Sequence, residues 1–109
     1  MSAAIVHLRP RARTDLAACY AYIGDRNPDA AHRFRQAAEV TMASLARMPG
    51  MGEPYEIANP RLEGLRCARV GRFRNYLIFF RPHEGGIDVI RVLHAARNIE
   101  DILKAEEDE

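Results

Sequence analysis

The sequence predicts an α+β fold in which an antiparallel helical hairpin packs on one face of a mostly antiparallel sheet. Two observations predict this fold. Residues 12–48 carry apolar side chains at helical spacing with one interruption, and residues 65–94 carry short apolar runs separated by turn residues. The length of 109 residues fits a single domain over residues 1–109, and residues 98–109 are expected to form a short acidic C-terminal helix and tail.

The N-terminal part predicts a strand followed by two helices. Residues 4–8 are an apolar run that fits a first strand, and Pro10 can open a helix at its first turn. The first helix has five apolar residues at spacings of three and four, namely Ala12, Leu16, Cys19, Tyr20 and Ile23. Residues 24–27 are expected to end it. The second helix begins at Asn27, which can cap it, followed by Pro28 and Asp29, and it stops at Pro49-Gly50.

The C-terminal part predicts a three-stranded meander that completes the sheet begun by the N-terminal strand. Residues 50–64 are a long segment that is either a functional loop or a connection wrapping from the helix to the sheet. Strands are expected at residues 65–70, 73–81 and 87–94. Gly71-Arg72 suits a type II′ turn, and residues 82–86 are expected to form the second turn. Strand 73–81 has apolar side chains on both faces, which indicates a central strand.

The final helix should start at Asn98 as its cap and place apolar residues up to Leu103 on its inner side. The residues that follow are acidic, which opposes the helix dipole. We therefore expect this end to fray and the tip after Leu103 to be dispensable. Residues 98–109 carry one Lys and six acidic residues, a net charge of −5. Residues 1–97 carry 15 Arg and nine acidic residues, a net charge of +6. A basic body suits a nucleic acid or an acidic protein partner, or is simply a solvated surface.

The sequence contains no pattern typical of a cofactor, metal or membrane protein. The longest apolar run, residues 76–80, is too short to span a bilayer, and residues 1–8 do not resemble a secretory signal, so we expect a cytoplasmic protein. Cys19 and Cys67 are isolated and are expected to be small buried residues that form neither a disulfide nor a metal site. No cofactor is expected, because no glycine-rich phosphate loop or nucleophile motif is present.

Arginines concentrate in the C-terminal half and should cluster in part on adjacent strands, among them Arg66, Arg69, Arg72, Arg74, Arg81, Arg91 and Arg97. They either bind phosphate or carboxylate groups of a partner or keep the sheet edges soluble. His94 lies three residues before Arg97 and is either an acid–base group or a hydrogen-bonded structural residue. Tyr22 lies off the apolar stripe of the first helix, where it is either an interface anchor or an ordinary exposed aromatic residue.

A series of short segments, in order and at compatible spacing over nearly the whole chain, resembles the RelE/ParE toxin superfamily and its ParE branch in particular. The segments are residues 8–12 (Leu-Arg-Pro-Arg-Ala), 27–31 (Asn-Pro-Asp-Ala-Ala), 45–52 (Leu-Ala-Arg-Met-Pro-Gly-Met-Gly), 76–81 (Tyr-Leu-Ile-Phe-Phe-Arg) and 91–98 (Arg-Val-Leu-His-Ala-Ala-Arg-Asn). No single segment is specific, but the series is.

The resemblance implies a toxin of a ParDE-like type II toxin–antitoxin system, of the kind associated with plasmid stabilisation. Such toxins inhibit DNA gyrase and are neutralised by a ParD-like antitoxin, often in a heterotetramer. Operator DNA is then contacted only indirectly, through the antitoxin. We expect Tyr22, Arg66 and Arg74 to bind the antitoxin, and Arg81, Arg91, His94 and Arg97 to contact the target.

The resemblance also leaves an alternative function, because the sister RelE branch consists of ribosome-dependent mRNA endonucleases. Their sites combine basic residues with a Tyr or His near the C-terminus. Here Arg97 is followed by Asn98 and Ile99, and His94 is the only nearby substitute. The sequence therefore favours a protein inhibitor without catalytic residues over a ribonuclease, and an inactive toxin that only binds its antitoxin stays possible. Replacing Arg81, Arg91 and Arg97 together by Ala is expected to abolish toxicity.

Overall fold

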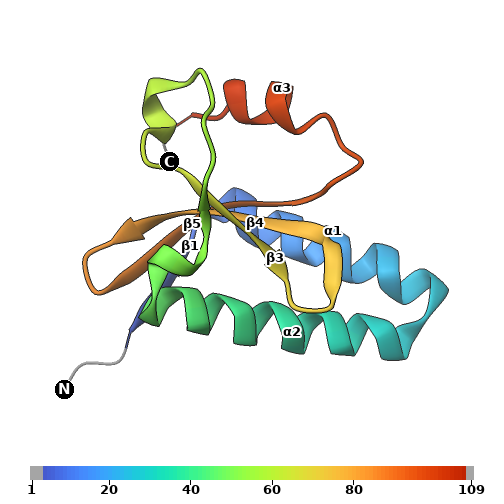
Figure 1. The fold of residues 1–109 in the computed structure, drawn as a ribbon. Coiled ribbons are helices and arrows are strands. Elements are labelled where there is room, and N and C mark those ends of the chain that lie inside the picture. The colour runs from blue at the N-terminus through green and yellow to red at the C-terminus, as the bar shows by residue number, and fades with distance from the viewer. Residues whose placement is uncertain (1–3, 108–109) are drawn as a thin grey trace.

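The computed structural model describes residues 4–107 and confirms the predicted α+β fold (Figure 1). The five strands are β1 (Ile5–Leu8), β2 (Glu53–Pro54), β3 (Arg66–Val70), β4 (Phe73–His83) and β5 (Gly86–His94). They form one sheet in the order β1-β5-β4-β3-β2, in which β1 runs parallel to β5 and the other pairs are antiparallel. Helices α1 (Pro10–Arg26) and α2 (Pro28–Arg47) cover one face, and α3 (Ile99–Lys104) lies on the other.

One residue joins the two long helices. The backbone N–H of Asn27 donates to the carbonyl of Ile23 and closes α1, while its side-chain oxygen accepts from the N–H of Ala30 (3.1 Å) and caps α2. This confirms the predicted start of the second helix. The first helix is three residues longer than expected, because Gly24 to Arg26 stay helical until Pro28 forces a new start.

The sheet has an apolar core on each face, as the two apolar faces of the central strand predicted. Tyr76, Ile78 and Phe80 pack under the helical hairpin, where Phe34 of α2 is fully buried. Phe79 points to the opposite face and packs with Leu62, Leu65, Ile90, Leu93 and Leu103. The second core explains why the sheet needs α3 and the connection before β3: without them the apolar residues on this face would be exposed to water.

The turn predicted at residues 82–86 is wrong in its extent. Strand β4 continues to His83, with Pro82 opposite Ile87, and β5 already begins at Gly86. Pro82 is tolerated because β3 pairs with β4 only as far as Phe80, so Pro82 lies where β4 is an edge strand. The turn at Gly71-Arg72 agrees with the type II′ expectation, since Gly71 has a φ of +43°.

The segment between α2 and β3 is a wrapping connection built from two short 3₁₀ turns (Pro49–Met51 and Pro60–Leu62) and β2. Gly52 passes directly over the ring of Phe80, and a Cβ at Gly52 would lie 2.7 Å from Phe80 Cε1. The guanidinium of Arg66 donates to the carbonyl of Gly52 through Nε (3.1 Å) and so fastens this connection to the sheet. A side chain at position 52 would separate the connection from the core.

The C-terminal segment corrects two expectations. Asn98 makes no side-chain cap, and its amide instead donates to the carboxylate of Asp101 (2.7 Å). The chain does not fray directly after Leu103, because Glu106 is only 1% exposed and the side-chain amide of Asn59 donates to the carbonyls of Leu103 and Glu106 (2.9 Å each). Residues up to Glu106 therefore belong to the packed structure and are not a dispensable tip. Asp108 and Glu109 lie outside the described residues.

Candidate functional site

A buried ion-pair network sits where β5 extends beyond its partner β1. The pairing with β1 ends at Val89, so the next part of β5 has no strand on that side, although it stays paired with β4 on the other. Asp15 of α1 fills this position: its Oδ2 accepts from the backbone N–H of Val92 (2.9 Å) and from Nε of Arg91 (2.7 Å), and its Oδ1 accepts from Nη2 of Arg91 (3.0 Å). Asp15 therefore acts both as a counter-ion and as a substitute for a strand partner.

Glu106 completes the network from the C-terminal segment. Nη1 of Arg91 donates to Oε1 of Glu106 (2.9 Å), and all three residues are at least nine-tenths buried. The hydrogen bonds to Asp15, and secondarily those to Glu106, raise the pKa of Arg91 above its usual value despite burial. Arg91 is thus a fixed cation whose hydrogen bonds join α1, β5 and the C-terminal segment.

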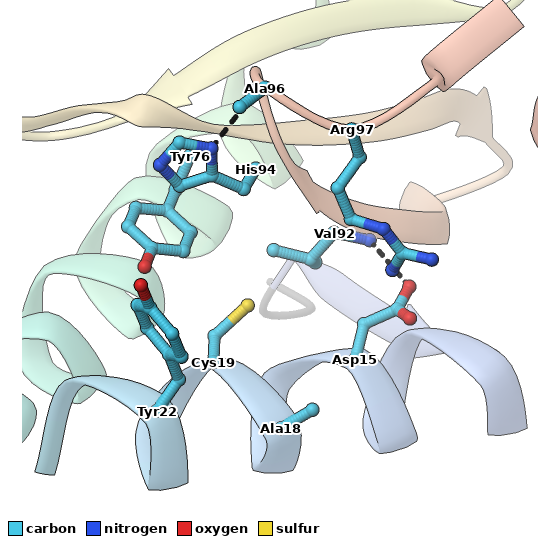
Figure 2. A pocket seen from close by; sticks show the side chains of 9 residues that line it. All are labelled: Asp15, Ala18, Cys19, Tyr22, Tyr76, Val92, His94, Ala96 and Arg97. Atoms are coloured by element: carbon cyan, nitrogen blue, oxygen red, sulfur yellow. Dashed lines mark hydrogen bonds between the residues drawn. The ribbon is translucent and has the colours of Figure 1, made fainter. Parts of the chain in front are cut away.

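A pocket of about 430 Å³ opens next to this network, between α1 and the adjacent ends of β4 and β5 (Figure 2). It is lined by nine residues, namely Asp15, Ala18, Cys19, Tyr22, Tyr76, Val92, His94, Ala96 and Arg97. We call it the α1–β5 pocket. Its volume lies in the range of about 300–1,000 Å³ that is typical of ligand sites.

The polar groups of the α1–β5 pocket differ in how they are held. The backbone N–H of Ala96 donates to Nδ1 of His94 (2.9 Å), so the neutral ring carries its proton on Nε2. The His94 ring also packs edge-on against Tyr76, with the ring centroids 4.9 Å apart. Figure 2 shows the hydroxyls of Tyr22 and Tyr76 pointing toward one another across the pocket. Arg97 is exposed, and its side chain, which reaches toward α1, makes no hydrogen bond or ion pair with any residue between 4 and 107.

Two groups in the pocket are held in their uncharged forms. Burial, followed by the nearby charge of Asp15, raises the pKa of the Cys19 thiol to about 11. Burial likewise raises the pKa of Tyr76. Neither side chain is therefore suited to act as an anionic nucleophile or base near neutral pH. Cys67, which lies on β3, has a pKa raised to about 11 by burial, and both cysteines are free thiols that are half-buried rather than fully buried.

The structure separates the four residues expected to contact the target. His94 and Arg97 line the α1–β5 pocket, whereas Arg91 lies behind it with only 9% exposure. Arg81 lies at the other end of β4, roughly 17 Å along the strand from Tyr76, and donates to the carbonyl of Arg61 (2.9 Å). The predicted basic cluster is therefore not a single surface.

The residues expected to bind the antitoxin are also spread over the molecule. Tyr22 is 55% exposed at the mouth of the α1–β5 pocket, with the guanidinium of Arg26 3.9 Å from its ring centroid. The guanidinium of Arg66 is hydrogen-bonded to the carbonyl of Gly52, in the connection between α2 and β3. Arg74 is exposed and lines a separate groove of about 650 Å³ between α2 and β3.

Sequence reasoning missed Asp15, Tyr76 and Glu106. Asp15 carried a usable signal, because it lies three residues after Ala12 and four before Cys19, within the apolar stripe of the helix. A carboxylate at a buried position requires a cationic or hydrogen-bonded partner. Tyr76 was predicted as a core residue only. Glu106 is one of several acidic residues near the C-terminus, and nothing in the sequence distinguishes it.

A second ion pair fixes the entry to α1. Nε and Nη2 of Arg9 donate to Oδ2 of Asp88 on β5 (3.1 and 2.9 Å), and Nδ1 of His7 lies 3.0 Å from Oδ1 of Asp88. Burial raises the pKa of Asp88, but the hydrogen bonds from Arg9 and His7 outweigh it, and the net effect is a lowered pKa. This pair supports the β1–β5 pairing, in which His7 lies opposite Asp88.

No group of three potential metal-binding side chains occurs among residues 4–107. Within the same part of the chain, no helix has both the length and the apolar character needed to cross a membrane.

Comparisons with known proteins agree with this architecture. The model of a family described as the ParE toxin of the type II toxin–antitoxin system parDE matches residues 6–99. A solved structure titled "Chromosomal ParDE TA system from P. aeruginosa" is similar with a TM-score of 0.66 and 20% sequence identity, covering 85% of this chain and 98% of that chain. At this identity the structural likeness shows the fold alone. The comparison with curated proteins found no match.

Proposed function

We propose that this chain, which belongs to the ParE toxin family of type II toxin–antitoxin systems, inhibits DNA gyrase when free and is neutralised by a ParD-like antitoxin. The observation that carries the proposal is the family match over residues 6–99, which spans every element from β1 to the start of α3. The inhibitor acts by binding and needs no cofactor.

The chemistry of the α1–β5 pocket favours an inhibitor over a ribonuclease. Cleavage of RNA needs one group to remove a proton and another to supply one. Nδ1 of His94 is already occupied by the N–H of Ala96, so the ring has no free lone pair with which to accept a proton. Burial raises the pKa of Tyr76, which makes that hydroxyl a poor base. Three arginines that could stabilise a phosphate in the transition state, Arg81, Arg91 and Arg97, do not converge on one point.

The proposed partners follow from the family and from the charge of the chain. Residues 1–97 carry a net charge of +6, which favours association with an acidic antitoxin segment. We propose a complex of two toxins and two antitoxins, in the cytoplasm, that contacts operator DNA only through the antitoxin. Tyr22 and Arg74 are the exposed residues proposed to contact the antitoxin. His94 and Arg97, which the sequence suggested as target contacts, both line the α1–β5 pocket.

The test is a supercoiling assay with purified gyrase and antitoxin-free toxin, run beside a ribosome-dependent mRNA cleavage assay. Loss of supercoiling with intact mRNA is the expected result. Cleaved mRNA with normal supercoiling would replace the proposal with the ribonuclease alternative. If neither activity is present, expression without antitoxin in growing cells decides whether the chain is an inactive toxin: unimpaired growth is the result that would establish this.

The contribution of the exposed pocket residues is measured in the same supercoiling assay. Arg97→Gln removes an exposed charge without a partner in the described part of the chain and should leave the fold intact. Arg13→Gln is the matched control, since Arg13 is exposed on the opposite side of α1. Arg91 is unsuitable for this purpose, because its replacement would disrupt the buried network. The triple replacement expected from sequence to abolish toxicity therefore cannot distinguish lost contact from lost fold.

A further inference from the structure

We infer that the α1–β5 pocket is an anchor site for the antitoxin, which inserts an apolar side chain between α1 and β5 and places a neighbouring carboxylate on Arg97. This inference rests on the proposed toxin–antitoxin function and adds the site and the chemistry of the contact.

The walls of the pocket suit an apolar group. Ala18 and Val92 present only carbon atoms, and the thiol of Cys19 stays protonated because burial raises its pKa. The volume of about 430 Å³ is larger than any one aliphatic side chain and leaves room for an aromatic ring together with part of a neighbouring residue. Apolar burial of this kind supplies most of the energy at protein interfaces through a few anchor side chains.

The carboxylate and imidazole acceptors at the pocket are already engaged. Both carboxylate oxygens of Asp15 accept hydrogen bonds from Arg91, and one of them also accepts from the N–H of Val92. Nδ1 of His94 accepts from Ala96. Asp15 therefore lies directly against the guanidinium of Arg91, and both of its oxygens already have donors.

The polar groups that remain available can all donate. They are the guanidinium of Arg97, the Nε2–H of His94, and the hydroxyls of Tyr22 and Tyr76, which face one another across the opening (Figure 2). Arg26, which lies over the ring of Tyr22, adds a second positive charge at the rim. A ligand group that accepts hydrogen bonds and carries negative charge is therefore complementary to the pocket, and a basic group is not.

The occupant is assigned to the antitoxin by the size and charge of the site. A free carboxylate metabolite would use the donors but leave the apolar walls unfilled, whereas a polypeptide with an apolar residue beside Asp or Glu satisfies both. Tyr22 is exposed at the rim, and exposed tyrosines often act as interface anchors. The +6 charge of residues 1–97 attracts an acidic segment over longer distances.

The experiment measures binding of the full-length toxin to its cognate antitoxin by calorimetry, at low and high salt. Arg97→Gln should weaken binding by about 10- to 100-fold, the range expected for a hydrogen bond to a charged group. Its affinity should also depend less on salt than that of the unaltered toxin. Tyr76→Phe, which keeps the ring contact with His94, should weaken binding by about 2- to 10-fold. Arg13→Gln is the control and should change affinity by less than about twofold, as expected of a surface substitution outside the interface.

Two results would overturn the inference. Equal affinities of the Arg97→Gln and Arg13→Gln variants would mean that Arg97 contributes only general charge. Unchanged antitoxin binding with lost gyrase inhibition in Arg97→Gln would assign the pocket to gyrase instead. The experiment is separate from the proposed function, because a toxin that fails to inhibit gyrase can still be titrated with the antitoxin. Thermal unfolding of each variant checks that the fold is kept.

Discussion

Replacing Arg91 by Ala should unfold much of the protein at temperatures at which the unaltered chain is folded. The substitution removes two hydrogen bonds to Asp15 (2.7 and 3.0 Å) and one to Glu106 (2.9 Å). It leaves the buried carboxylate of Asp15 without its cation and that of Glu106 with only Arg11, 3.7 Å away. Breaking a buried ion pair by removing one partner costs about 3–5 kcal/mol. The total free energy of unfolding of a domain is about 5–15 kcal/mol, so this loss is a large part of it.

The expected change is large enough to measure in two ways. For a domain of this size, 1 kcal/mol corresponds to about 4–8 °C, so a loss of about 3–5 kcal/mol in Arg91→Ala should lower Tm by about 12–40 °C. Urea unfolding followed by circular dichroism gives the free energy directly. Arg97→Gln is the control, because replacing an exposed side chain that has no hydrogen bond or ion pair within residues 4–107 should change stability by no more than about 0.5 kcal/mol.

A double-mutant cycle tests the cause of the loss. If Arg91 and Asp15 stabilise each other, the Asp15→Ala/Arg91→Ala double variant should be more stable than the sum of the single losses predicts, by about 0.5–3 kcal/mol. Additive losses would show that the two residues act independently. A loss below about 1 kcal/mol for Arg91→Ala would refute the reasoning altogether, because the network would then contribute no more stability than an exposed ion pair does.

Three further predictions concern other parts of the fold. Gly52→Ala should destabilise the protein by about 1–3 kcal/mol, because the added methyl group enters the core; Gly50→Ala, where no atom lies within 4 Å, should not, and equal urea midpoints would contradict this. Cys19 and Cys67, whose thiol pKa values are raised from 9.0 to about 11, should carry about 100-fold less thiolate near pH 8 than ordinary cysteines and react slowly with a thiol reagent until the chain is unfolded; a rapid reaction of the folded protein would count against their burial. Because the folded-state pKa of Asp88 is lowered, the stability it contributes is present above the unfolded value of about 3.9 and is lost as the pH falls through the folded value. Asp88→Asn should therefore lose more stability at pH 6 than at pH 3, and a loss independent of pH would argue against the ionic contribution.

The fold could be predicted from the sequence because its elements are specified locally. The two helices have apolar stripes of helical period, and Asn27 followed by Pro28 marks the boundary between them. The central strand was predicted from its apolar residues alone. The errors lie where tertiary contacts decide the outcome: Pro82 stays in a strand because its neighbour β3 has already ended, and Glu106 is buried because Arg91 holds it.

The candidate site could be predicted only in part. His94 and Arg97, which the sequence suggested as neighbouring site residues, both line the α1–β5 pocket. Tyr22 joins them from α1, although sequence reasoning had assigned it to a different partner. Arg91 has the same side chain as Arg97 and lies only six residues away, but its carboxylate partners are 76 and 15 residues distant in sequence. Which of two arginines is buried depends on such distant contacts and cannot be derived from local pattern.

The parallel pairing of β1 with β5 has a consequence for how each new molecule is made. Synthesis proceeds at about 5–20 residues per second, so about 4–16 s pass between the emergence of β1 and that of the strand with which it pairs. During this interval the helical hairpin can form from local contacts, but Val92, His94 and Arg97 do not yet exist, and the α1–β5 pocket lacks most of its wall. The pocket is therefore one of the last features to form in a nascent chain. The helical hairpin forms earlier and is available to an antitoxin before the pocket is.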